Sequence, residues 1–154
     1  MHYSSHLESL VKQNVSRQWQ FFVCSLFETL ASSYPEEERL AFLTKMGKHA
    51  SRSISISPEL TLAELNKLIN EFWFERRWGH CNIFEKDNGL IIEHYISPLC
   101  ALLNPEHQEY GDAFLTGMYS TWLAEASMPY KGIVKRLNAE EIEGIAVRLS
   151  YHVI

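Results

Sequence analysis

Apolar residues recur along this chain mainly at helical spacing, and the clearest case is the stretch 104–127. At about 100° per residue, one broad side of this predicted helix is apolar. That side carries Tyr110, Phe114, Leu115, Met118 and Trp122. A second side carries only small residues, namely Ala113, Gly117, Ser120 and Ala124.

Gly117 is unfavourable inside a helix by about 1 kcal/mol relative to alanine, which indicates that another backbone passes close to it. The ridge of small residues around it has two interpretations. It is either a tight crossing within the chain or a contact with a second subunit, and we predict Ala113, Gly117, Ser120 and Ala124 as subunit-contact residues.

Three more helices are predicted before the middle of the chain. Apolar residues at helical spacing predict the first over about 7–31. Ser33 and Glu36 have the spacing of a capping box, which predicts the start of a second helix. Thr61 and Glu64 have the same spacing and predict the start of a third.

Beyond the third helix the apolar pattern becomes alternating, which is typical of strands. Stretches 78–86 and 90–96 flank an Asp-Asn-Gly turn at 87–89, a strong hairpin signal. Two further strands are predicted at 131–137 and 145–153. The order helix, helix, helix, hairpin, helix, strand, strand predicts an α+β fold with about four helices packed on a small antiparallel sheet.

Length and composition indicate one globular domain, 1–154, that needs no metal or disulfide to fold. The net charge of −5 argues against a general affinity for nucleic acid, because neutralising phosphates requires a basic surface. No apolar run is long enough to span a membrane, and the first residues lack the pattern of a secretory signal. Three cysteines without paired spacing indicate buried thiols, so we expect a cytoplasmic protein.

Cys81 and His94 are the first pair to consider for chemistry, since the hairpin places them on one sheet face. Two such ligands begin a zinc site, but structural zinc needs four. Ile83 and Ile92 share this face, so we favour a packed thiol beside a hydrogen-bonded histidine. No nucleophile elbow, phosphate-binding glycine loop or metalloprotease motif is present, and we expect no enzyme activity, metal or cofactor.

The first residues have a composition suited to carbohydrate. His2, Tyr3, Ser4 and Ser5 combine aromatic faces, which stack on sugar rings, with groups that hydrogen-bond hydroxyls. The alternative is a frayed terminus without a role.

Four segments form a further pattern, namely Gly117-Met118-Tyr119 followed by Trp122, Asn138 to Glu141 before a last strand with Arg148 to His152, Glu64-Leu-Asn66, and Trp78-Gly79. In their order along the chain these segments resemble the cellulose synthase operon protein D family. The resemblance implies a non-catalytic accessory subunit of bacterial cellulose synthase that forms a ring-shaped homo-octamer, a tetramer of dimers. It also implies that the ring guides β-1,4-glucan chains or aligns synthase complexes, with His2 to Ser5 facing an inner passage.

The family has also been placed in the periplasm, which is the alternative to the cytoplasmic location expected above. The predicted order of elements from the third helix onward also resembles the vinyl-reductase-like and transport-particle domains. That resemblance implies a different function, a regulatory module that binds a small ligand or a partner protein in a pocket beside the long helix.

Overall fold

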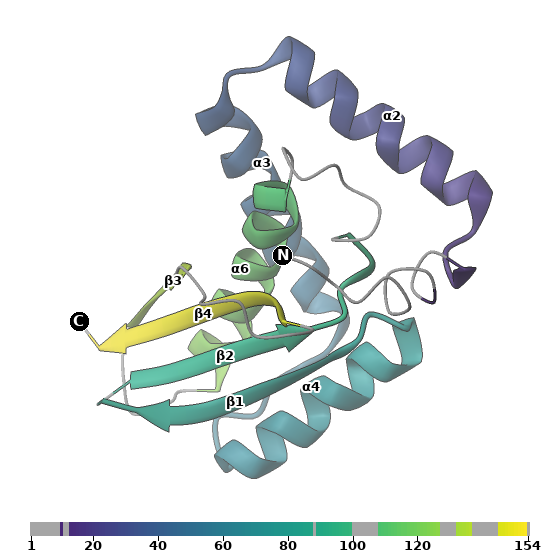
Figure 1. Cartoon of the computed structure of the whole chain (residues 1–154). Coiled ribbons are helices and arrows are strands. Elements are labelled where there is room, and N and C mark those ends of the chain that lie inside the picture. The colour runs from purple at the N-terminus through teal and green to yellow at the C-terminus, as the bar shows by residue number, and fades with distance from the viewer. Residues whose placement is uncertain are drawn as a thin grey trace.

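A computed structural model of the chain describes residues 10, 13–87, 89–99, 108–126, 132–136 and 145–153. Its helices are α2 (Arg17–Ser33), α3 (Glu36–Ala50), α4 (Leu62–Arg76) and α6 (Gln108–Glu125), and the 3-10 turn η1 (Ser51–Ser53) follows α3. Its strands are β1 (His80–Lys86), β2 (Gly89–Tyr95), β3 (Gly132–Arg136) and β4 (Ile145–Val153). Figure 1 shows α6 across one face of the sheet, α4 along the outer side of β1, and α2 at the periphery. The predicted α+β architecture and order of elements are confirmed.

The four strands form one antiparallel sheet in the order β1-β2-β4-β3. β1 and β2 are the predicted hairpin, in which Lys86 pairs with Gly89 and Cys81 lies directly opposite His94. Asp87 in the turn has a φ of 50°, a left-handed conformation that Asp and Asn adopt more readily than most residues. The alternating pattern thus predicted the hairpin and the shared face of Cys81 and His94.

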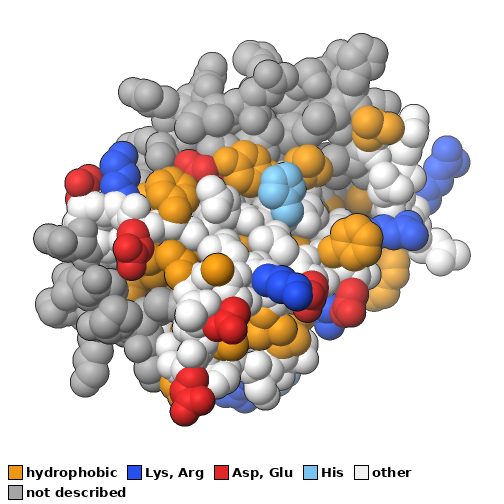
Figure 2. Space-filling model, turned by 90° about the horizontal axis from the view of Figure 1, so that it is seen from below, with side chains coloured by type: hydrophobic (Ala, Val, Ile, Leu, Met, Phe, Trp, Pro, Cys, Tyr) orange, Lys and Arg blue, Asp and Glu red, His pale blue; other side chains and the backbone are white. Residues whose placement is uncertain are grey.

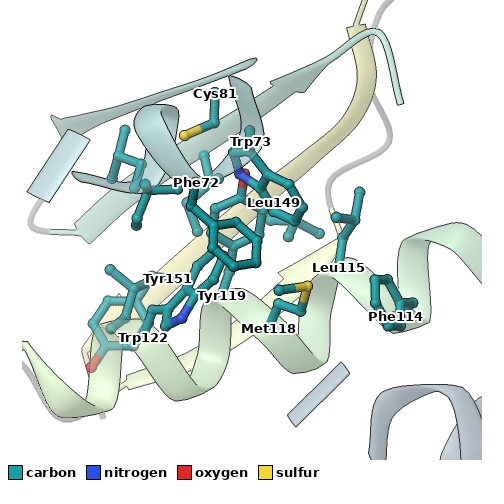
Figure 3. Packing of buried hydrophobic residues seen from close by; sticks show 14 of the residues in the cluster. Phe72, Trp73, Cys81, Phe114, Leu115, Met118, Tyr119, Trp122, Leu149 and Tyr151 are labelled. Atoms are coloured by element: carbon teal, nitrogen blue, oxygen red, sulfur yellow. The ribbon is translucent and has the colours of Figure 1, made fainter. Parts of the chain in front are cut away.

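The core lies between α6 and the sheet and is rich in aromatic side chains (Figure 3). The whole predicted apolar side of the long helix is buried, comprising Tyr110, Phe114, Leu115, Met118 and Trp122. Trp73 of α4 packs against Trp122 with ring centroids 5.5 Å apart and an interplanar angle of 67°. β4 contributes Leu149 and Tyr151, which point to the same side of the strand. Such edge-to-face packing suits aromatic quadrupoles and fixes α4 and α6 on the same face.

α3 and α6 cross at two glycines. A Cβ atom on Gly117 would lie 2.1 Å from the backbone oxygen of Thr44, and one on Gly47 would lie 2.0 Å from that of Phe114. No side chain fits at such a distance, so each glycine allows the other helix to approach. For Gly117 the interpretation as a crossing within the chain is therefore confirmed. The same approach turns Gly47 toward the core and leaves Met46 exposed.

The predicted start of the second helix at Ser33 is wrong. Ser33 is the last residue of α2, and the N-cap of α3 is Pro35, which makes no side-chain cap hydrogen bond. Pro35 drives the preceding Tyr34 into extended backbone, with φ −131° and ψ 145°, so α3 cannot begin before it. The first turn of α3 instead contains Glu36, Glu37 and Glu38, where carboxylates interact favourably with the helix dipole.

At the start of α4 the predicted capping box is confirmed. The Thr61 N–H donates to Glu64 Oε2 at 2.8 Å, and the Glu64 N–H donates to Thr61 Oγ1 at 3.3 Å. The bond from the Thr61 N–H, together with one from the Thr61 hydroxyl to the same Glu64 oxygen at 2.8 Å, lowers the pKa of Glu64, because both stabilise the carboxylate.

α4 closes one edge of the sheet with two asparagines. Asn66 Oδ1 accepts from the Ile83 N–H at 2.8 Å, and Asn66 Nδ2 donates to the Ile83 oxygen at 2.7 Å. Asn70 makes the same pair of bonds with Cys81, at 2.8 and 2.9 Å. Four residues along a helix rise about 6 Å and two along a strand about 6.7 Å, so the two repeats nearly match. The asparagines therefore satisfy edge groups of β1 that would otherwise be free to pair with another strand.

Candidate functional site

A chain of hydrogen bonds runs through the core with the fully buried His94 at its centre. His94 Nδ1 lies 2.7 Å from the Tyr119 hydroxyl, and its Nε2 lies 2.8 Å from the backbone oxygen of Trp78. Trp73 donates its indole N–H to the same hydroxyl oxygen at 3.0 Å. The chain thus connects α4, β2, α6 and the segment before β1.

The partners of His94 determine its tautomer. A carbonyl oxygen only accepts, so Nε2 carries the proton and donates to Trp78, and Nδ1 accepts from the Tyr119 hydroxyl. Burial lowers the pKa of His94 to about 4, because an imidazolium would lose its hydration there, although the bond to Trp78 acts in the opposite direction. At neutral pH this imidazole is uncharged.

Cys81 lies beside this chain of hydrogen bonds. Burial raises the pKa of its thiol to about 12, and a hydrogen bond with the Tyr119 hydroxyl only partly opposes this. Burial also raises the pKa of Tyr119. The interpretation of a packed thiol beside a hydrogen-bonded histidine is confirmed. Within the described ranges no three His, Cys, Asp or Glu side chains are grouped to hold a metal ion. Cys81, His94 and Tyr119 hold β1, β2 and α6 together as neutral groups, and a protonated thiol is a poor nucleophile.

The four residues predicted to contact carbohydrate, His2, Tyr3, Ser4 and Ser5, lie outside the described residues. Their role stays a prediction.

The predicted subunit-contact residues of α6 differ in exposure. Gly117 is buried against α3, Ala113 and Ser120 are half-buried, and Ala124 is exposed. Ser120 donates its hydroxyl to the Thr116 backbone oxygen at 2.6 Å, within its own helix. A contact of these residues with a second subunit stays a prediction.

A groove of about 690 Å³ lies between the start of α2, the end of α4 and residues 96–99. Its lining includes Trp19, Phe74, Arg76, Arg77, Trp78 and Leu99. The Arg76 guanidinium lies 3.7 Å from the ring centroid of Phe72, which holds it in place by a cation–π contact. The lining thus combines exposed aromatic faces with two cations, and it suits a ligand or partner with both apolar and anionic groups.

Periodicity alone missed this groove, although the sequence carries a signal for it. Phe72, Trp73 and Phe74 are consecutive, and at about 100° per residue three neighbours cannot all face one core. Phe72 and Trp73 are buried, whereas Phe74 is 82% exposed. Phe74 thus joins Trp19 and Trp78 in the groove lining, and contiguous exposed apolar surface of this kind is a sign of a binding site.

α2 exposes more apolar surface than any other helix in the described part of the chain. Trp19 is 64% exposed, Phe21 77% and Phe22 60%. α2 is attached to the body through Phe27, whose ring stacks on that of Tyr110 with centroids 5.5 Å apart. By contrast, the face over α4 and β1 shows charged side chains of both signs scattered among hydrophobic ones (Figure 2). The α2 surface is therefore the strongest candidate for a contact with another molecule.

None of the described helices has the length and apolarity that a membrane crossing requires. A search of curated proteins found no match. A family model for the D subunit of cellulose synthase matches residues 5–150, nearly the whole chain.

Proposed function

The chain belongs to the family of cellulose synthase D subunits and so has a role in cellulose synthesis, and from this we propose that it is a non-catalytic accessory component of the synthase complex. Copies of the chain assemble into a homo-octameric ring, a tetramer of dimers. The ring guides β-1,4-glucan chains or aligns synthase complexes, so that the chains associate into ordered cellulose ribbons.

The observation that carries this proposal is the family match over residues 5–150. Two structural features support this proposal, one for the role in assembly and one for the non-catalytic role. α2 presents exposed aromatic side chains, which are frequent at protein interfaces. The buried His94, Cys81 and Tyr119 are neutral and hydrogen-bonded to one another or to the backbone, as expected of structural groups.

At the level of residues, His2, Tyr3, Ser4 and Ser5 face the passage of the ring and contact glucan. The exposed Ala124 forms the subunit contact on α6, with the half-buried Ala113 and Ser120 at its border. Gly117 contributes indirectly, because it lets α3 pack closely against α6 and so fixes the position of α6. The protein works on the cytoplasmic side of the synthase complex.

Two measurements test this function. Light scattering after size exclusion should give a concentration-independent mass near eight chains of 17.9 kDa. Deleting the gene should lower cellulose yield or crystallinity while isolated membranes still polymerise glucose. Complete loss of polymerisation would contradict the non-catalytic role, and a monomeric protein at all concentrations would contradict the ring.

The groove favours a second candidate function, a regulatory module that binds a small ligand or a partner protein, although it lies beside α2 and α4 and not beside the long helix α6. Its volume of about 690 Å³ is within the range of small-molecule sites, and Trp19, Phe74 and Trp78 supply apolar contact area. Native mass spectrometry of the purified protein should then show a copurifying small molecule. Loss of that molecule in a Trp78→Ala variant, with the fold kept, would assign it to the groove.

A further inference from the structure

We infer that α2 is the surface through which two copies of this chain meet, with the two α2 helices antiparallel about a twofold axis. This inference rests on the proposed function in one respect, that the chain acts as an assembly of copies. It adds the contacting element, the orientation of the two copies and the residues that determine both.

The first argument is that the apolar arc of α2 is wider than the part that the chain itself covers. Phe27 and Leu30 face the body of the protein and are buried. Beside them runs a second stripe at i, i+3 and i+7, formed by Trp19, Phe22 and Leu26. The first two are 64% and 60% exposed, and their rings meet edge to face at 6.0 Å. A preformed, solvent-exposed aromatic pair of this kind is typical of an interface.

The area is sufficient for the centre of a dimer interface. Two copies bring four such aromatic side chains, and each aromatic buries about 150–250 Å² when fully covered. At their present exposure, covering them removes about 500 Å² from water. A stable interface buries about 1,200–2,000 Å² in total, so these side chains cover its centre, and the groove beside Trp19 adds further apolar surface in each copy.

The size of the side chains along the stripe favours an antiparallel arrangement. Beyond Leu26 the stripe continues with small polar residues, Thr29 and Ser33. When Leu26 lies on the twofold axis, Trp19 of each copy faces Ser33 of the other, so large side chains meet small ones. A parallel arrangement would instead place Trp19 against Trp19 and leave a gap at Ser33.

Charge favours the same arrangement. Directly after α2, the first turn of α3 carries Glu36, Glu37 and Glu38, and none of the three forms an ion pair with a described residue. At the other end of α2, the groove beside Trp19 carries Arg77 and Arg76, the latter in an exposed ion pair with Glu75 at 3.4 Å. The 17 residues of α2 span about 25 Å, more than the screening length of about 10 Å, so the two ends do not attract each other within one copy. An antiparallel pair brings each acidic end to a basic end, whereas a parallel pair would bring six carboxylates together.

The test is the mass of the full chain in solution. The double variant Trp19→Glu/Phe22→Glu should weaken association by about 100-fold or more, because it buries carboxylates at the centre of the interface. The matched control is Phe21→Glu. Phe21 is 77% exposed on the same helix but lies about 120° around it from the stripe, so this variant should keep the wild-type mass. An unchanged mass for the double variant, or an equal loss for the control, would overturn the inference.

A charge exchange separates a lost interface from a lost fold. Reversing Arg76 and Arg77 to glutamate should weaken association about tenfold, and so should reversing Glu36 to Glu38 to lysine. Combining both sets in one chain should restore it, which an unfolded protein cannot do. Failure of the combined variant to regain association, with the far-ultraviolet circular dichroism of the wild type, would overturn the antiparallel arrangement.

The outcomes also distinguish this inference from the proposed ring. A wild-type mass of two chains that falls to one in the double variant supports the α2 pair and contradicts the octamer. A mass of eight chains that persists in the double variant supports the octamer and contradicts the α2 pair. A wild-type mass of one chain at every concentration contradicts both.

Discussion

At the buried residue His94, one part of the environment was predictable from the sequence and another part was not. The alternating pattern predicted that it shares a sheet face with Cys81, because successive strand residues point to opposite faces. Its partners Tyr119 and Trp78 were not predictable, since pattern arguments place a residue on a face but do not say which side chain of another helix reaches it. The predicted cap at Ser33 was wrong for a related reason, because the effect that moves the helix start came from Pro35, two positions away.

The buried state of His94 predicts a specific loss of stability in mild acid. Its pKa is about 4 in the fold against 6.5 for the unperturbed group, so the unfolded state binds more protons between these values. Stability is therefore fully present above about pH 6.5 and declines as the pH falls toward about 4. From about pH 7.5 to about pH 5, this histidine should lower the free energy of unfolding by about 2 kcal/mol.

Urea unfolding at several pH values measures this effect. The comparison is His94→Gln, which keeps one donor and one acceptor but does not titrate. The variant should be less stable at neutral pH and should show a flatter pH dependence by about one proton. Parallel pH profiles for the two proteins would show that His94 is not the titrating group.

Gly117 also acts at the scale of one residue. The sequence predicted a close backbone neighbour there but did not identify it as α3, because nothing in the sequence around Gly47 indicates that it faces another helix. We expect Gly117→Ala to lower the free energy of unfolding by about 1–2 kcal/mol, since the clash with the Thr44 oxygen exceeds the gain in helix propensity.

Gly47→Ala should have a similar effect, because its Cβ would meet the Phe114 oxygen. Ala41→Leu, at an exposed position of α3, is the control and should change stability by less than about 0.5 kcal/mol. A glycine variant as stable as the wild type in urea would mean that the two helices move apart without loss.

At the scale of elements, the pairing of α4 with β1 depends on two side chains that the helical pattern alone does not reveal. Asparagine is mildly unfavourable inside a helix, because its helix propensity is lower than that of leucine or lysine. Asn66 and Asn70 are four residues apart, so they fall on one side of the helix. Only the structure shows that this side faces the edge of a strand.

Replacing both asparagines by leucine should therefore destabilise the protein although it improves helix propensity. Four hydrogen bonds to Cys81 and Ile83 are lost, and we expect the free energy of unfolding to fall by about 2–4 kcal/mol. Lys67→Leu makes a similar change of hydropathy at an exposed position of the same helix, and it should be near neutral. Equal urea midpoints for the double variant and this control would show that water replaces the asparagine amides at no loss.

At the scale of the whole molecule, the sequence predicted the architecture well and the exposed apolar surfaces poorly. Binary patterns predicted all four described helices and the sheet, because burial in a single core imposes the periods of 3.6 and 2 on the chain. The groove and the exposed stripe of α2 lie where large apolar residues exceed what the core covers, at Trp19, Phe22 and Phe74. Hydrophobic periodicity predicts which residues face the core, but it does not predict what the exposed apolar residues contact.

The two edges of the sheet differ, and this limits how many copies of the chain can associate edge to edge through their sheets. β1 is closed by α4, whereas β3, at the other edge, has β4 as its one strand neighbour in the described part of the chain. In the language of polymer chemistry, such a sheet is a monofunctional monomer. It can join one other sheet edge to edge, but the product has no reactive end, so the chemistry that propagates a fibril stops at two.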